Sequence, residues 1–193
     1  MLNHLNWYDH RIFEWIQVHL HGDSLNLIIS LFRDKFFWVP LYLMLISWIA
    51  IYNKKHFYII LISSFIVVAL TDQFSSNLLK KFFKRERPCR ELYFKDHFES
   101  LINCSGGYSF PSTHATNHAG IGIFLFLILS KSLPRGRYFL LIWPVLIGFA
   151  QIFVGVHFPF DVVFGLILGN LIGFVCFRLL QTILSKFKNL GTI

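Results

Sequence analysis

Charge is scarce in this chain, and negative charge is the scarcest. Only 10 of the 193 residues are Asp or Glu, against 18 that are Lys or Arg, and 15% of the chain is charged in total. Hydrophobic residues make up 55%, aromatic residues make up 18%, and the mean hydropathy is +0.56. These values exceed those of a soluble domain of this length. The composition therefore predicts an integral membrane protein, with an all-α fold built as a helical bundle.

Several other features are missing. The chain has no linker, repeat or low-complexity tract, so we expect a single membrane domain over residues 1–193. The N-terminus lacks a basic start followed by a clean apolar core, which argues against a cleaved signal peptide. No cluster of carboxylates suits Mg²⁺, and His114 and His118, four residues apart, have no third metal ligand of matching character. We therefore expect neither a metal nor another cofactor.

Five apolar blocks with almost no charge are candidates for membrane spans. A bilayer core needs about 20 apolar residues in a helix, with roughly 17–25 tolerated. The second block reaches that length only if its helix continues through the polar residues 71–79, and the third only if its helix begins near His114. Both extensions run toward polar clusters, as expected for helices whose ends open into a polar cavity. The five blocks are residues 36–52, 57–70, 119–133, 139–156 and 162–184, within a predicted bundle of residues 36–185.

Residues 1–35 differ from these blocks. Charged residues such as Asp9 lie among aromatic and aliphatic ones, and the centre of a bilayer does not accept that many charges. Phe13, Ile16 and Leu20 fall on one helical stripe. The segment therefore predicts amphipathic helices that lie in the membrane interface.

The basic residues predict an orientation. With five spans, loops 53–56 and 131–137 and the C-terminal tail share one side, and their Lys and Arg residues make that side cytoplasmic. Segment 80–95 lies on the other side and also carries many Lys and Arg residues. This conflict is resolved if several of these cations face a bound anion. We expect a bacterial inner (cytoplasmic) membrane protein whose polar clusters face the extracytoplasmic side.

The first polar cluster consists of Lys80, Arg87 and Pro88. A spacing of seven is close to two helical turns, so Lys80 and Arg87 can project from one face of a helix, which Pro88 then ends. Arg offers a bidentate fork to phosphate oxygens, and Lys offers a mobile point charge. The alternative is a solvated basic run that holds anionic headgroups. We assign to that class the neighbouring cations Lys81, Lys84 and Arg85.

The second cluster is the run Pro111, Ser112, Thr113 and His114, directly before an apolar block. Proline suits the first turn of a helix and Ser or Thr suits its cap. The free N–H groups of a helix start form an anion site. Capping alone explains Pro111 and Ser112, but it does not explain His114, whose imidazole can protonate a leaving oxygen.

The third cluster consists of His157 and Asp161. Phe158 and Pro159 mark the start of the last helix, which places His157 just before the helix and Asp161 in its first turn. A carboxylate there can accept the proton of one imidazole nitrogen, so that the other nitrogen faces a substrate as nucleophile. The alternative is an interfacial His that pairs with a helix-capping Asp.

Together the three clusters resemble the type-2 phosphatidic acid phosphatase superfamily of membrane lipid phosphatases. The family pattern is a Lys-x6-Arg-Pro block, a Pro-Ser-x-His block and a Ser-Arg-x5-His-x3-Asp block, in that order. The first two blocks match in full, from Lys80 to His114. The third matches up to Asp161, with Ala150 in place of Ser and Gln151 in place of Arg.

The resemblance implies a helical-bundle fold, catalysis without a metal, and a role for each matched residue. His157 attacks phosphorus to give a phosphohistidine, Asp161 orients His157, and His114 protonates the leaving group. The phosphate oxygens are held by Lys80, Arg87, Ser112, Thr113 and Gln151.

Gln151 puts one phosphate contact in doubt. A hydrogen bond to a charged group contributes about 1.5–3 kcal/mol, so loss of the arginine costs roughly one to two decades in binding or rate. Gln still donates a neutral hydrogen bond, and the cations of segment 80–95 can compensate. Two interpretations remain open, an active phosphatase and a catalytically weakened lipid-phosphate-binding protein.

Cys89 and Cys104 lie in the loop that we place outside, an oxidising setting in which they can form a disulfide. Cys176 lies in the last span, where it packs as a small apolar residue. Asp72 lies in the polar half of the second span. It either pairs with a cation of the phosphate site or accepts a hydrogen bond from a neighbouring helix.

The sequence therefore predicts an integral membrane lipid phosphatase that hydrolyses a phosphate monoester or a diphosphate. Undecaprenyl diphosphate, phosphatidylglycerol phosphate, phosphatidate and lipid A all place a phosphate at the interface beside an apolar tail. A polyprenyl diphosphate is our first choice, and lipid A is an alternative. The expected partners are the phosphorylated lipid and the bilayer, with no nucleic acid.

Overall fold

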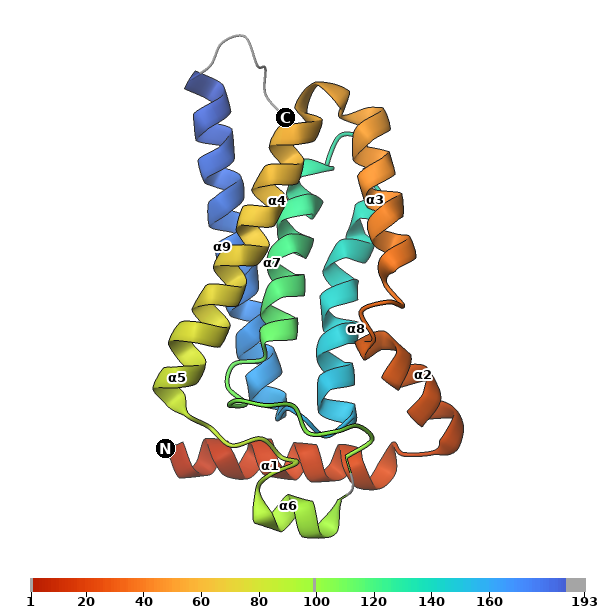
Figure 1. Ribbon diagram of the computed structural model, residues 1–193, viewed down its shortest axis with the longest axis vertical. Helices are drawn as coiled ribbons and strands as arrows, with labels where there is room; N and C mark the ends of the chain where they lie inside the picture. Colours follow the sequence, from red (N-terminus) through yellow and green to blue (C-terminus); the bar gives the residue numbers. More distant parts are fainter. Residues whose placement is uncertain (1, 99, 187–193) are drawn as a thin grey trace.

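The computed structural model describes residues 2–98 and 100–186, and no strand occurs among them. Most helices run side by side along the long axis, while α1 lies across one end (Figure 1). The all-α fold is therefore confirmed. The helices are α1 (Leu2–His19), α2 (Asp23–Arg33), α3 (Val39–Tyr52), η1 (Lys54–His56), α4 (Phe57–Asp72), η2 (Gln73–Leu79), α5 (Lys80–Phe83), α6 (Leu92–His97), α7 (Thr113–Ile128), η3 (Gly136–Tyr138), α8 (Phe139–Phe153) and α9 (Pro159–Lys186).

Three helical stretches are long and apolar enough to cross a membrane, namely Lys54–Phe83, Gly136–Phe153 and Pro159–Lys186. The other two predicted spans correspond to α3, with 14 residues, and α7, with 16. Both are shorter than the roughly 20 residues that a bilayer core needs. Each predicted block therefore forms a helix of the bundle, while the count of five spans stays a prediction.

Both predicted helix extensions are present in the structure. α4 continues through η2 into α5, so the polar residues 71–79 are helical, and part of this stretch has π-helical geometry. Inside it, the Ser75 hydroxyl donates to the Thr71 carbonyl at 2.8 Å, which satisfies a buried polar side chain. α7 begins at Thr113, one residue before His114.

Close packing of α7 on α9 fixes the position of the functional clusters. A Cβ atom at Gly169 would collide with the carbonyl oxygen of Thr116, and one at Gly173 would collide with that of Gly120. The two helices therefore touch backbone to backbone, a contact that only small residues allow. Because Ser112 caps α7 and Asp161 lies in the first turn of α9, this contact sets the distance between the second and third clusters.

The N-terminal helix α1 packs against the rest of the protein through the apolar stripe identified in the sequence. Phe13 and Ile16 are buried in a cluster with Phe94 and Phe158, beneath the end of the bundle that α1 crosses. On the other face, Trp7 is more than half exposed. The stripe therefore belongs to the protein core. The interfacial position of α1 stays a prediction. An exposed Trp is consistent with it, because Trp is enriched at the membrane–water interface.

Gly169→Ala should destabilise the bundle, because its new methyl group meets backbone that cannot move aside. Overpacking of this kind costs about 1–3 kcal/mol. We expect a lower midpoint of thermal unfolding in detergent, measured by circular dichroism. Gly22→Ala is the matched control, since nothing lies within 4 Å of a Cβ atom at Gly22. Equal midpoints for the two variants would contradict the proposed contact.

Candidate phosphate-transfer site

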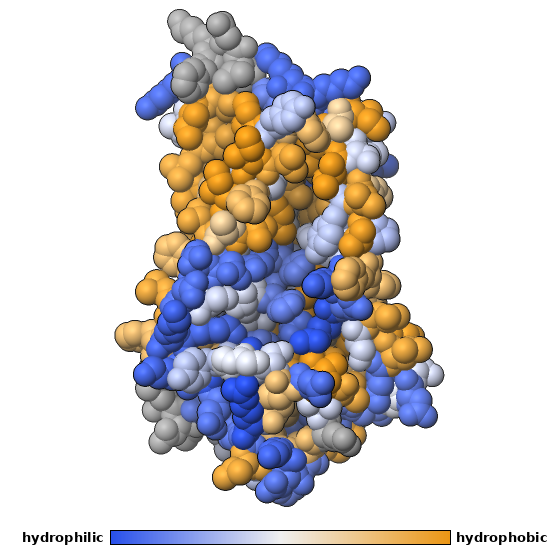
Figure 2. All heavy atoms as spheres, viewed as in Figure 1, coloured by the Kyte–Doolittle hydropathy of each residue, from blue (hydrophilic) through white to orange (hydrophobic). Residues whose placement is uncertain are grey.

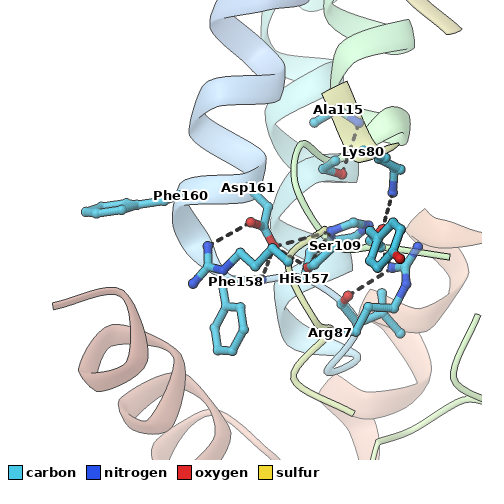
Figure 3. Close-up of polar contacts among 12 residues, drawn as sticks. Lys80, Arg87, Ser109, Ala115, His157, Phe158, Phe160 and Asp161 are labelled. Carbon is cyan, nitrogen blue, oxygen red and sulfur yellow. Dashed lines mark hydrogen bonds and ion pairs between the residues drawn. The ribbon is translucent and has the colours of Figure 1, made fainter. Parts of the chain in front are cut away.

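The three sequence clusters meet at the end of the bundle that α1 crosses. Figure 2 shows the corresponding band of hydrophilic residues, below a largely hydrophobic surface. In Figure 3, Asp161 lies on one side of His157, and Lys80 and Arg87 lie on the other. These residues come from α9, the α8–α9 connection, α5 and the loop that follows α5. The four side chains are buried, which makes their charges interact strongly.

His157 is held in one tautomer. Its Nε2 lies 3.0 Å from Nη1 of Arg87. A guanidinium can only donate, so Nε2 must accept and the neutral ring carries its proton on Nδ1. Burial lowers the pKa of His157 to about 4, and although Asp161 opposes this shift, the charges of Arg87 and Lys80 add to it. Nε2 therefore keeps its lone pair at neutral pH.

Asp161 and Ser109 orient the protonated side of the ring. Nδ1 of His157 lies 3.5 Å from Oδ2 of Asp161 and 3.3 Å from Oγ of Ser109. Ser109 also donates a hydrogen bond to the same carboxylate oxygen, which accepts a further one from the Phe158 amide at 2.9 Å. The Ser109 hydroxyl therefore bridges the imidazole and the carboxylate.

The sequence analysis did not identify Ser109. It stands just two residues before Pro111 and the second cluster, but one Ser in a loop is not by itself a signal of a functional site. The contacts arise because the loop folds back over the start of α9. There the Ser112 amide donates to the Asp161 carbonyl at 2.9 Å.

Arg85 was assigned to a solvated basic run, and this assignment was wrong. Its Nη1 lies 2.8 Å from Oδ1 of Asp161, and its Nη2 lies 2.6 Å from Oδ2 of Asp9. The guanidinium also sits 4.2 Å from the centre of the Phe158 ring. One cation therefore joins the buried carboxylate of α9 to a buried carboxylate of α1.

Asp9 completes this bridge from the N-terminal helix. Its Oδ1 accepts a hydrogen bond from the Phe160 amide, in the first turn of α9, at 2.8 Å. Burial raises the pKa of Asp9, and the attraction of Arg85 opposes that rise. The sequence identified Asp9 only as a charge unsuited to a membrane span.

Lys80 and Arg87 do not share a helix, contrary to the sequence prediction. The helix ends at Phe83, and Lys84 then adopts a left-handed conformation with φ of 49°. This turn ends the helix before Pro88 can. Arg87 instead reaches the site from the loop, donating to the Val156 carbonyl at 3.0 Å, while Lys80 Nζ donates to the Tyr108 carbonyl at 2.7 Å.

The second cluster forms the start of α7 as predicted, with one shift. Ser112 is the N-cap and accepts from the Ala115 amide at 3.5 Å, while Pro111 precedes the cap. The Thr113 hydroxyl lies 3.1 Å from that of Ser76. His114 is exposed, and both His157 and Lys80 act on it electrostatically.

Gln151 lies next to His157 in the structure. It is buried, and its backbone carbonyl accepts from the His157 amide at 3.2 Å. Among the described residues, its side-chain Nε2 has no hydrogen-bond partner. A buried amide donor without a partner is costly unless a ligand or water satisfies it.

Three further features of the sequence analysis also have a place in the structure. Cys89 and Cys104 are joined by a disulfide. Asp72 accepts from Asn117 of α7 at 3.4 Å, so the helix-to-helix hydrogen bond of the two alternatives is present. The His118 ring lies 3.1 Å from the Tyr42 hydroxyl. Over residues 6–98 and 100–186, no group of three His, Cys, Asp or Glu side chains is arranged to hold a metal.

An apolar cavity of about 570 Å³ opens between the helices, on the bundle side of the polar band. Its polar end is formed by Asn117 and His118, one turn along α7 from His114. Most of its remaining lining is apolar. The lining comprises Tyr42, Leu45, Ile46, Ile49, Phe57, Leu61, Ser64, Phe65, Val68, Asn117, His118, Ile121, Leu125 and Trp143.

Comparison with known proteins decides the family. A family model described as the PAP2 superfamily matches residues 55–185, well over half of the chain. The chain belongs to the PAP2 superfamily. The resemblance inferred from the three sequence blocks is thereby confirmed, and the match includes all of them.

Individual relatives agree with this family. The lipid A 4'-phosphatase of Bacteroides thetaiotaomicron is 26% identical over 176 residues, covering 88% of this chain and 76% of that protein. The undecaprenyl-diphosphatase BcrC of Bacillus subtilis is 38% identical over 79 residues, covering 41% of this chain and 39% of that protein. These PAP2 relatives are membrane lipid phosphatases. They support the prediction that this chain is a phosphoric monoester or diphosphate hydrolase.

A solved structure shows the same fold. The transmembrane PAP2-type phosphatidylglycerolphosphate phosphatase of Bacillus subtilis superposes with a TM-score of 0.68 at 24% identity, covering 92% of this chain and 86% of that one. The predicted integral membrane helical bundle is therefore confirmed.

Arg85→Gln should weaken both the site and the fold. Removing one partner of a buried ion pair costs about 3–5 kcal/mol, and Asp161 loses the cation that holds one of its oxygens. We expect phosphatase activity to fall at least tenfold, mainly in kcat, with a lower unfolding midpoint. The exposed Arg135, at the other end of the bundle, supplies the control Arg135→Gln.

Adding Asp9→Asn to Arg85→Gln separates the two effects. The second change removes one of the two buried carboxylates that lose Arg85, so the unfolding midpoint should recover in part. Activity should stay low, because Asp161 still lacks Arg85. Recovery of kcat together with the midpoint would mean that Arg85 serves the fold alone.

Proposed function

We propose that this protein hydrolyses the phosphate of a membrane lipid through a phosphohistidine at His157. The observation that carries the proposal is the state of its buried imidazole. Nδ1 is backed by Ser109 and Asp161, while Nε2 keeps a lone pair toward Arg87. This is the arrangement that a histidine nucleophile needs.

In the first step of the proposed mechanism, Arg87 moves its donors from His157 to the incoming phosphate. Without substrate, Nη1 of Arg87 occupies the lone pair of Nε2 at 3.0 Å. Phosphate oxygens are stronger acceptors than a neutral imidazole, so they draw the guanidinium away. Nε2 is then free to attack phosphorus, and Lys80 adds a second positive charge to the developing oxyanion.

As the bond between Nε2 and phosphorus forms, the bond from phosphorus to the leaving oxygen breaks. The leaving oxygen takes the electron pair and accepts a proton from His114. Water then attacks the phosphohistidine and gives a proton to His114, which restores His157 and releases phosphate. Asp161 stabilises the positive charge that the imidazole acquires in the intermediate.

Other polar groups complete the proposed phosphate site. Ser112 and Thr113 lie at the start of α7, where free N–H groups and the helix dipole favour an anion. Gln151 contributes its unpartnered buried Nε2 as a neutral donor. If this neutral donor cannot replace an arginine in catalysis, the protein is instead a catalytically weakened lipid-phosphate-binding protein.

The substrate that we propose is a lipid A-type phosphate monoester. The supporting observation is the similarity to a lipid A 4'-phosphatase over 88% of this chain. A polyprenyl diphosphate, the first choice from sequence, is the second candidate, supported by the 38% identity to an undecaprenyl-diphosphatase over a shorter stretch. In both cases the apolar cavity beside His118 suits a lipid tail.

We also propose that the protein lies in a bacterial inner membrane, with its site on the extracytoplasmic side. The basic residues Lys54 and Arg135 occupy helix connections at the end of the bundle opposite the site. Positive charge favours the cytoplasmic side. A disulfide between Cys89 and Cys104 suits the oxidising side, where the site would lie.

His157→Ala should abolish phosphate release, because no other described side chain offers a nucleophilic nitrogen backed by Asp161. The assay uses purified protein in detergent with lipid A, undecaprenyl diphosphate, phosphatidylglycerol phosphate and phosphatidate as separate substrates. We expect the wild type to act on at least one of them, and His97→Ala, a change at an exposed histidine, to match it.

The outcomes of this panel separate the candidates. Fastest release from lipid A supports the proposed substrate, and fastest release from undecaprenyl diphosphate supports the second. Equal rates for His157→Ala and the wild type would refute the mechanism. If the wild type binds these lipids but releases no phosphate, the protein is a lipid-phosphate binder.

Activity should survive EDTA and should be inhibited by vanadate. The proposed site stabilises phosphate with cationic side chains and needs no divalent cation. Vanadate adopts the five-coordinate geometry of phosphoryl transfer and should compete with the lipid. The test is phosphate release with each reagent, and loss of activity in EDTA that added Mg²⁺ restores would contradict the prediction.

A further inference from the structure

The turn formed by Ser105, Gly106 and Gly107 gathers arginines from two parts of the chain. Arg87 donates to the Gly107 carbonyl at 3.3 Å and to the Gly106 carbonyl at 3.4 Å. Arg33, the last residue of α2, donates from Nη2 to the Ser105 hydroxyl at 3.3 Å. The sequence analysis did not consider Arg33, because 54 residues separate it from Arg87.

Arg33 is partly buried and incompletely satisfied. Its Nε is buried and has no hydrogen-bond partner among the described residues. No carboxylate of residues 6–98 or 100–186 lies within 4.0 Å of its guanidinium. The adjacent Asp34 instead accepts from the Phe36 amide at 2.8 Å. Asp34 attracts the guanidinium through space, but the buried Nε still lacks a hydrogen-bond partner, so this position favours an anionic ligand.

The charge of Arg33 acts on two residues of the candidate site. Burial, and then the charges of Arg90 and Arg33, lower the pKa of Arg87 to about 10. The charge of Arg33 also acts on His114. Arg33 and Arg87 hold the same 105–107 turn, and the charge of Arg33 reaches both Arg87 and His114.

The packing of α2 explains how Arg33 comes to this place. α2 packs along α8, the helix that carries Gln151. Arg33 is the last residue of α2, and its side chain reaches the 105–107 turn that also binds Arg87. A guanidinium missing from α8 can be supplied from this neighbour.

The other cations near the site are engaged or exposed. Arg85 is bound between two carboxylates. Arg90 is exposed and donates to the Ser105 carbonyl at 2.9 Å. Lys81 and Lys84 are exposed. Among the described cations outside the first cluster, Arg33 combines a buried unpartnered donor with proximity to Arg87 and His114.

We propose that Arg33 supplies the phosphate-binding guanidinium that position 151 lacks. It contacts oxygens of the transferred phosphate, within electrostatic reach of Arg87 and His114. Gln151 is then an adapted residue, because an arginine there would meet the charge of Arg33. This inference rests on the proposed function, since it names a further residue of the same site.

The test is a double-mutant cycle of Arg33→Gln and Gln151→Arg, with phosphate release from the best lipid substrate as readout. Arg33→Gln should lower kcat/KM by roughly 10- to 100-fold, the range expected for one charged hydrogen bond. Gln151→Arg alone should give no gain. In the Arg33→Gln background, Gln151→Arg should restore at least tenfold.

Controls address folding and chemistry. Arg135→Gln removes an exposed arginine at the other end of the bundle and should match the wild type. Arg33→Lys keeps the charge but loses the fork, so its kcat/KM should lie between those of the wild type and Arg33→Gln. Equal unfolding midpoints for Arg33→Gln and the wild type would show that the loss is not one of folding.

Three kinetic results would overturn the proposal. The first is a kcat/KM of Arg33→Gln within twofold of the wild type. The second is a double variant no faster than Arg33→Gln, which would show that the two positions do not share a ligand. A gain from Gln151→Arg alone would likewise contradict it, because the position would then be simply defective.

A binding measurement separates this proposal from the proposed function. Vanadate is titrated calorimetrically into the wild type, Arg33→Gln and Arg135→Gln. At least tenfold weaker binding to Arg33→Gln alone supports Arg33 as an anion ligand, even if the wild type releases no phosphate from any lipid. Equal binding to all three proteins removes Arg33 from the site, even if the wild type is an active phosphatase.

Discussion

The buried carboxylate of Asp161 is the group on which the site depends. Arg85 neutralises one oxygen, while Ser109 and the Phe158 amide bind the other. Because a buried charge is tolerated only when it is paired and hydrogen-bonded, each of these partners is fixed in place by the need to satisfy it. The orientation of His157, the path of the loop over α9 and the position of α1 all follow from this requirement.

The cations around this carboxylate differ in the partners that they bind. Arg85 stays behind Asp161 and is fully occupied by carboxylates. Lys80 and Arg87 instead donate to backbone carbonyls and to the imidazole, partners that a phosphate can replace. The same segment, from α5 into the loop that follows it, thus contains one cation held by carboxylates and two held by neutral acceptors. Spacing along the sequence does not distinguish the two kinds, because both lie within eight residues.

Sequence patterns predicted the features that depend on residues close together in the chain, namely the positions and starts of helices. The apolar blocks gave the helices, the cap at Ser112 gave the start of α7, and Pro159 gave the start of α9. Contacts that join distant segments could not be predicted in this way. Arg85 resembled its solvated neighbours until Asp9 and Asp161 were placed beside it. The helix also ended early at Lys84, since a left-handed residue other than Gly has no strong sequence signal.

The bridge through Asp9 has a consequence for how the protein assembles during its synthesis. Asp9 leaves the ribosome before its backbone partner Phe160, which is made 151 residues later. Arg85 can satisfy only part of the buried charge in the interval. The candidate site is therefore complete only when α9 has been made and packed, and a chain still under synthesis carries Arg85 and Asp9 without Asp161 beside them.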